Sequence, residues 1–180
     1  MDSQIIPDMK HSLIQTLLRA VGLTPQWLHY LNENIVPTPC RVSVHLGVFV
    51  EPFLEHIFRG TKTVESRFSV NQCAPFGVAR QGDVILLKEA AGPVSGICRV
   101  RTVWSYHVDP DSLMELQERF GAAMCAANPE FWAQRSDAAF ATLMQIDDVC
   151  KFEPFLVDKR DRRGWVVIKK RSQQRLLWDE

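Results

Sequence analysis

The chain has 180 residues, of which 46% are hydrophobic and 23% charged, a balance typical of a soluble globular protein. This length allows one domain of ordinary size with an appended segment. Lysine plus arginine and aspartate plus glutamate both number 21, so the formal net charge is zero. This balance excludes a general electrostatic attraction to nucleic acid or to membranes, and any such attraction must be local.

The cysteines are odd in number and form no Cys-x-x-Cys pair, which argues against a disulfide framework and against a zinc knuckle. A reducing cytoplasm fits this usage best, and we expect neither a metal nor a cofactor. The first twelve residues carry an early acid and no long apolar run, so we expect no signal peptide. No stretch approaches the roughly 20 apolar residues of a spanning helix, and we expect no membrane partner.

Residues 1–40 are predicted to form a helical N-terminal extension. The stretch 7–22 has an acidic N-cap, an apolar stripe and a terminal glycine, and a Thr-Pro pair at 24–25 begins a second helix. A helix-turn-helix is one interpretation, but the segment lacks a basic recognition face. A hairpin that covers the core is therefore favoured, and the prolines of 36–41 mark a domain boundary.

Beyond residue 41 the hydrophobic pattern becomes that of strands. Valine and leucine alternate with other residues over 42–50, which predicts a strand with one buried side. A short helix over 51–60 precedes a strand over 63–68, and a loop over 70–83 ends in a Gly-Asp turn.

The second half continues this mixture of strands and helices. Its predicted elements are strands over 84–90 and 94–104, a helix over 109–127, one or two further helical stretches over 128–146, and a last hairpin that pairs 149–157 with 164–170. We therefore predict an α+β fold with a small, closed or nearly closed barrel over 41–172 and a C-terminal tail over 173–180.

Three charged side chains, Lys62, Glu65 and Arg67, stand within six residues in the stretch GTKTVESR, residues 60–67. On a regular strand Glu65 and Arg67 share a face, whereas Lys62 lies in the preceding turn. An ammonium binds phosphate as a point charge, a guanidinium offers a planar fork, and a carboxylate accepts hydrogen bonds or fixes both cations. The alternative is a surface Glu–Arg pair worth under about 1 kcal/mol.

The motif Gly-x-Lys-x-x-Glu-x-Arg, with a strand and short helix before it and a Gly-Asp turn and strand pair after it, resembles the hallmark of the ASCH domain, a PUA-like β-barrel. The resemblance extends over about residues 42–170. It implies a cleft beside the barrel in which Lys62, Glu65 and Arg67 gather, and a function in binding RNA or nucleotides. Relatives that hydrolyse acetylcytidine or cut RNA imply a hydrolase as the alternative, with Lys62 and Glu65 as its catalytic residues.

The amidohydrolase pattern has a threonine three residues after the lysine, where this chain has Glu65. A hydroxyl nucleophile is therefore missing at that position, and the adjacent Thr63 and Ser66 do not replace it because neighbours on a strand point to opposite faces. For RNA cleavage, His45 could join Lys62 and Glu65 as acid or base, but the sequence does not place His45 near them.

A local basic stretch supports the binding hypothesis. Its proposed ligand-binding residues lie on the turn 158–163 and are Lys159, Arg160, Arg162 and Arg163. Such a turn can hold a phosphate backbone, and a solvated turn is the equally weighted alternative. Three aromatic residues either stack on a base or belong to the core: Trp104, Tyr106 and Trp165.

The leading hypothesis is thus a cytoplasmic RNA- or nucleotide-binding protein whose site is Lys62, Glu65 and Arg67. A hydrolase acting on a modified nucleoside or on RNA is the second hypothesis. A third is a protein-interaction module that binds a protein partner through its N-terminal helices.

Overall fold

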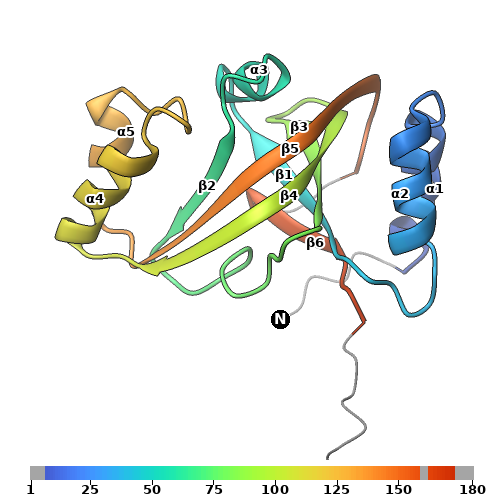
Figure 1. Ribbon diagram of the computed structural model, residues 1–180, viewed down its shortest axis with the longest axis horizontal. Helices are drawn as coiled ribbons and strands as arrows, with labels where there is room; N and C mark the ends of the chain where they lie inside the picture. Colours follow the sequence, from blue (N-terminus) through green and yellow to red (C-terminus); the bar gives the residue numbers. More distant parts are fainter. Residues whose placement is uncertain (1–6, 159–161, 173–180) are drawn as a thin grey trace, which may run out of the picture.

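The computed structural model describes residues 7–158 and 162–172 (Figure 1). The helices of these residues are α1 (Pro7–Ala20), α2 (Pro25–Asn34), α3 (Phe53–Phe58), α4 (Pro110–Phe120) and α5 (Pro129–Ala133). The strands are β1 (Val44–Phe49), β2 (Val64–Ser69), β3 (Val84–Glu89), β4 (Val94–His107), β5 (Phe140–Phe155) and β6 (Trp165–Lys169).

The strands form one mixed sheet in the order β2-β5-β4-β3-β1-β6. Only the β1–β3 pair is parallel, and the long strands β4 and β5 cross the sheet side by side. The sheet curls into a half-barrel, with β2 and β6 as its two unpaired edges (Figure 1). The predicted α+β class is therefore confirmed, but the described strands leave the barrel open between β2 and β6.

Helices lie at both ends of the curled sheet and cover its outer surface. Helices α1 and α2 pack on one end and α4 and α5 on the other, while α3 lies above the rim (Figure 1). The interior of the half-barrel holds a separate apolar cluster: Phe49, Leu54, Ile57, Ala79, Ile85, Leu87, Cys98, Val100, Met144, Ile146 and Trp165.

The first two helices cover the sheet, as the hairpin interpretation expects. Leu17, Val21 and Leu31 are almost fully buried, in the same apolar cluster as Val44 and Leu46 of β1. Their burial stabilises the sheet by roughly 1.5–3 kcal/mol for each large side chain. The apolar side of α1 and α2 therefore packs against the sheet of the same chain. In the part of the chain that the structure describes, no helix is both long and apolar enough to cross a bilayer.

The prediction that β1 has one buried side is wrong, because both of its faces are covered. Val44 and Leu46 face the cluster beneath α1 and α2, whereas His45 and Phe49 are buried toward the half-barrel interior. A strand that is covered on both faces has no side exposed to solvent. The residues between the valines are therefore buried as well, and the alternation did not indicate an exposed face. Val50, expected in the apolar face, is exposed beyond the end of the strand.

Two further predictions are wrong in the C-terminal half. Residues 140–146 were assigned to helix, but they begin β5, which pairs with β2 on one side and β4 on the other. Alanine, leucine, methionine and glutamine favour helices, and pairing on both sides overrides that preference. The expected hairpin between 149–157 and 164–170 does not form, since β6 pairs with β1 instead.

Candidate functional site

The three motif side chains meet at the open edge of the half-barrel. Glu65 lies between the two cations: its Oε2 is 3.3 Å from Lys62 Nζ and its Oε1 is 2.7 Å from Arg67 Nε. The Arg67 contact is out of line for a hydrogen bond and is therefore an ion pair. Lys62 and Glu65 are each only 4% exposed, whereas the Arg67 side chain is 20% exposed. The cluster therefore has a buried end and an open end.

The local fold explains this arrangement. Helix α3 ends beside Gly60, which has a φ of 73° that favours glycine, and the chain turns so that the Lys62 amide donates to the His56 carbonyl. Strand β2 then places Glu65 and Arg67 on its inner face. Val64 and Phe68, on the opposite face, pack beneath α4 and α5.

Lys62 is surrounded by acceptors. Its Nζ donates to the carbonyls of Val64 at 2.9 Å and Met124 at 3.1 Å, and Glu65 lies on a third side. Two hydrogen bonds and one ion pair therefore hold the Lys62 ammonium, which has three N–H bonds to offer. Lys62 therefore ties the start of β2 to the segment after α4, and it does not line a described cavity.

Arg67 spans the opening between the two edges of the sheet. Its Nη1 donates to the Gly164 carbonyl and its Nη2 to the Val48 carbonyl, both at 3.0 Å. The guanidinium also lies 5.0 Å from the ring centroids of Phe49 and Trp165, within the range of cation–π attraction. These contacts hold the guanidinium plane in one position.

Beside Arg67 lies a cavity of about 360 Å³, here called the Arg67 cavity. Its lining residues include two arginines, a threonine and three aromatic residues, although the Phe68 ring packs on the opposite face of β2: Arg67, Phe68, Phe76, Thr142, Arg163 and Trp165. Thr142 of β5 is directly opposite Arg67 in the strand register and is 1% exposed. Its Oγ1 is buried and has no hydrogen-bond partner among the described residues. A buried hydroxyl without a partner costs about 1–3 kcal/mol, which an incoming acceptor or donor would recover.

Trp165, which forms one wall of this cavity, is fixed by a buried polar chain. Its indole Nε1 donates to His45 Nδ1 at 3.1 Å, so His45 Nε2 carries the proton that it donates to Asp83 Oδ2 at 3.0 Å. His45 and Asp83 are fully buried. His45, considered above as an acid or base for RNA cleavage, thus uses both ring nitrogens in this chain.

The charges of the cluster also affect the pKa of two neighbouring side chains, Arg135 and Cys98. Burial lowers the pKa of the Arg135 guanidinium from its ordinary value, with Glu65 opposing this effect and Arg67 adding to it. Burial raises the pKa of the Cys98 thiol well above its usual range, and Glu65 contributes in the same direction. Cys98 is therefore held as a neutral thiol and supplies no thiolate nucleophile.

The other predicted residues divide between the cavity, the surface and the core. Arg163 lines the Arg67 cavity and Arg162 is exposed, while Lys159 and Arg160 lie outside the described residues. Trp104 and Tyr106 pack into the cluster beneath α4 and α5. Over residues 7–158 and 162–172, no group of three or more histidines, cysteines, aspartates or glutamates is arranged to hold a metal ion.

Thr142 was missed by sequence reasoning. Its segment reads as helical, and the register that places it opposite Arg67 joins strands far apart in the chain. The only available signal was a β-branched residue within a run of helix-favouring residues.

No protein-family model matches the sequence, and no curated protein matches it. Among solved structures, the fold is similar to the crystal structure of ASCH from Zymomonas mobilis, with a TM-score of 0.51 and 16% identity over 64% of this chain and 74% of that one. An ASCH domain from Lactobacillus crispatus aligns over 84% of this chain and 99% of that one, with 12% identity and a TM-score of 0.42. The chain has the fold of an ASCH domain, as the motif predicted.

Proposed function

We propose that the protein binds RNA or a nucleotide in the Arg67 cavity. The observation that carries the proposal is that one cavity is lined by Arg67 and by Thr142, its neighbour in the strand register, whose buried hydroxyl has no described partner. The fold of an ASCH domain supports the same reading, since the motif resembles that of a family thought to bind RNA or nucleotides.

Arg67 has hydrogen-bonding capacity left for a ligand. Its contacts with described residues engage Nε and one N–H of each terminal nitrogen. One N–H on Nη1 and one on Nη2 remain, and a guanidinium with two such donors binds a phosphate or the edge of a base. With the Thr142 hydroxyl beside them, these groups supply polar contacts of fixed orientation.

The remaining walls suit a flat heterocycle. Phe76 and Trp165 contribute aromatic residues to the lining, and stacking on such rings contributes about 1–3 kcal/mol per base. The cavity volume lies within the roughly 300–1,000 Å³ of small-molecule sites. Arg163 adds a second cation, and none of the described lining residues is acidic.

In this proposal Lys62 and Glu65 are positioning residues, and Arg67 is the residue that touches the ligand. Glu65 holds the Arg67 guanidinium, and Lys62 holds Glu65. Arg162 is proposed as an exposed phosphate contact beside Arg163. The basic residues Lys159 and Arg160, outside the described residues, are proposed to extend the same contact.

The hydrolase alternative stays a prediction, and the described geometry does not favour it. A general base needs a lone pair directed at a substrate. Lys62 Nζ instead lies among three acceptors, away from the Arg67 cavity.

The proposal is tested by fluorescence anisotropy with a labelled single-stranded RNA of about 12 nucleotides, a length within the range covered by one OB-fold. We expect binding that weakens as salt rises, and Arg67→Gln should reduce the affinity roughly tenfold or more. Arg59→Gln, on an exposed arginine of the α3 end that pairs with Glu55, is the matched control and should leave the affinity unchanged. Salt-independent or undetectable binding of RNA and of nucleotides would overturn the proposal.

A further inference from the structure

We propose that a second cavity, at the far end of β6, binds a backbone phosphate of the same RNA strand; this inference rests on the function proposed above. This cavity, here called the Arg41 cavity, is lined by residues 37–41, Arg171 and Ser172 and has a volume of about 650 Å³. It shares no lining residue with the Arg67 cavity.

The Arg41 cavity is lined by two arginines, one without an ionic partner among the described residues and one paired with a buried carboxylate. Arg41 is exposed, and its side chain forms no hydrogen bond or ion pair with any described residue. Arg171 donates through Nη2 to Asp83 Oδ2 at 2.6 Å, and its side chain remains 28% exposed. Asp83 itself is fully buried, and none of the described residues that line the cavity is acidic. A phosphate at this position would therefore meet Arg41 and the exposed part of the Arg171 guanidinium.

The walls of the Arg41 cavity are held in place without a ligand. The Cys40 amide donates to Ser172 Oγ at 3.2 Å, and the Ser172 amide donates to the Cys40 carbonyl at 3.0 Å. The Arg171 amide donates to Ser43 Oγ, also at 3.0 Å. These bonds join the segment before β1 to the segment after β6, so the backbone of both arginines is positioned before binding, and the bond to Asp83 also holds the Arg171 side chain.

Strand β6 connects the two cavities. Trp165 at its start lines the Arg67 cavity, and Arg171 just after its end lines the Arg41 cavity. Six residues of extended chain separate them, which corresponds to about 20 Å. One nucleotide does not reach both positions, whereas a short single strand does, and single-strand-binding grooves typically cover roughly 4–16 nucleotides.

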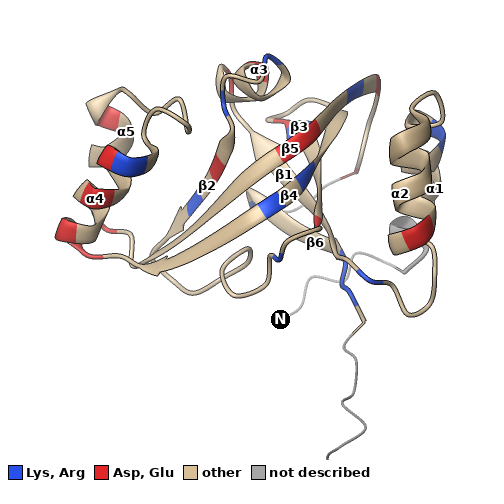
Figure 2. Cartoon of the chain, viewed as in Figure 1, with Lys and Arg blue, Asp and Glu red and all other residues tan. Residues whose placement is uncertain are grey.

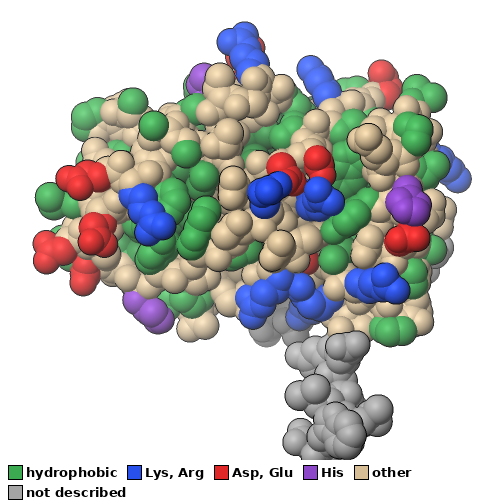
Figure 3. Space-filling view, viewed as in Figure 1, with side chains coloured by type: hydrophobic (Ala, Val, Ile, Leu, Met, Phe, Trp, Pro, Cys, Tyr) green, Lys and Arg blue, Asp and Glu red, His purple; other side chains and the backbone are tan. Residues whose placement is uncertain are grey.

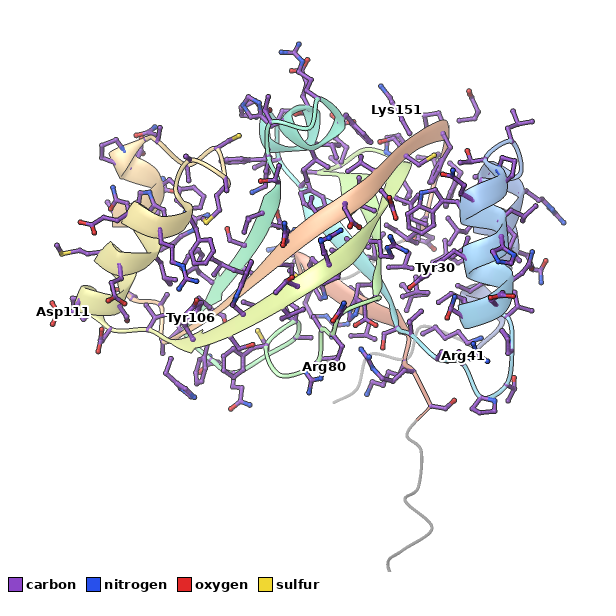
Figure 4. All side chains as sticks on the ribbon, viewed as in Figure 1. Tyr30, Arg41, Arg80, Tyr106, Asp111 and Lys151 are labelled. Atoms are coloured by element: carbon purple, nitrogen blue, oxygen red, sulfur yellow. The ribbon has the colours of Figure 1, made fainter. Side chains whose placement is uncertain are left out.

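The distribution of charge over the surface agrees with such a path. Acidic side chains lie on α4 and α5 at one end of the molecule (Figure 2). Lys and Arg side chains gather along the lower edge of the same view (Figure 3), where Arg80 and Arg41 are both found (Figure 4). Arg80 is exposed and belongs to the loop after β2, whose earlier residues Cys73–Phe76 line the Arg67 cavity. A neutral chain thus presents a basic edge to a polyanion.

The test compares wild type with Arg41→Gln in salt-dependent binding of the labelled 12-nucleotide RNA. Arg41 has no described partner, so its replacement leaves the fold intact, as thermal unfolding should verify. We expect the affinity to fall roughly tenfold and the slope of log affinity against log salt to decrease by about one. The affinity for a nucleoside monophosphate should not change, because a single nucleotide occupies the Arg67 cavity alone. Arg19→Gln, an exposed arginine in the last turn of α1, is the control and should change neither quantity.

The outcomes separate the two proposals. An unchanged slope and affinity for the 12-nucleotide RNA in Arg41→Gln would overturn the second site while leaving binding at the Arg67 cavity in place. Loss of affinity for the monophosphate as well would also overturn it, because Arg41 would then act on the first site. If wild type binds neither probe, both proposals fail.

Discussion

Two carboxylates in this molecule each hold two cations, one in the interior and one at the surface. Glu65 lies 3.3 Å from Lys62 and 2.7 Å from Arg67, and its side chain is 5% exposed. Asp147 lies 3.5 Å from Arg99 and 3.1 Å from Arg101, and its side chain is 25% exposed. Both carboxylates contact two cations, but their surroundings differ.

The difference in solvent exposure determines how much each cluster contributes to stability. Water and salt screen the outer cluster, and such pairs typically contribute about 0–1 kcal/mol. Water has little access to Glu65 in the inner cluster, where its side chain is 5% exposed, so removing Glu65 leaves two cations without their carboxylate. A buried cluster therefore fixes the position of its members, and the open end of this one is the Arg67 guanidinium at the cavity wall.

The largest expected effect comes from Glu65→Gln. It removes the carboxylate that contacts Lys62 and Arg67 and places an uncharged amide, with a donor NH2 at one end, between two cations. We expect the free energy of unfolding to fall by about 3–5 kcal/mol, measured by urea denaturation. A loss below about 1 kcal/mol would mean that the inner cluster behaves like the outer one.

A smaller effect is expected from Lys62→Met, which keeps the length of the side chain and removes its charge. The carbonyls of Val64 and Met124 lose their donor, and Glu65 retains Arg67. We expect a loss of about 1–3 kcal/mol in the same denaturation assay. Because Lys62 is a positioning residue, the salt dependence of RNA binding should keep its slope. A slope reduced by about one would show that Lys62 contacts phosphate directly.

The smallest effect is expected from Asp147→Asn in the outer cluster. It should change the free energy of unfolding by less than about 1 kcal/mol, and the difference should shrink as salt is added. Measurement of both variants at low and high salt sharpens the comparison, since the Glu65→Gln loss should persist at high salt. An Asp147→Asn loss as large as that of Glu65→Gln would contradict the distinction drawn between the clusters.

The sequence predicted part of the site, namely that Glu65 and Arg67 lie on the same face of a strand. Alternation along 63–68 placed Glu65 and Arg67 on one face, and the motif around them indicated the fold. The local pattern was sufficient there because a strand has a period of two whatever it pairs with.

The partner of Arg67 could not be predicted. Thr142 lies in a segment of helix-favouring residues that becomes strand only because β2 and β4 both pair with it. Arg41 was hidden for a similar reason: it lies in a proline-rich connector, and only the return of the chain after β6 brings Arg171 to the same cavity. The two residues of each pair, Arg67 with Thr142 and Arg41 with Arg171, are more than 70 positions apart in the sequence. No periodic pattern in the sequence relates residues at that separation.

The central claim is that the Arg67 cavity is a binding site, and Thr142→Val tests it most directly. The Thr142 hydroxyl has no partner among the described residues, so its removal should leave the free energy of unfolding unchanged or raise it by up to about 1 kcal/mol. Affinity for RNA, by contrast, should fall roughly 2- to 12-fold. Thr102→Val is the matched control: its hydroxyl donates to Gln145, so stability should fall slightly and affinity should not change. A Thr142→Val protein that is as stable as wild type and binds RNA equally well would contradict the claim.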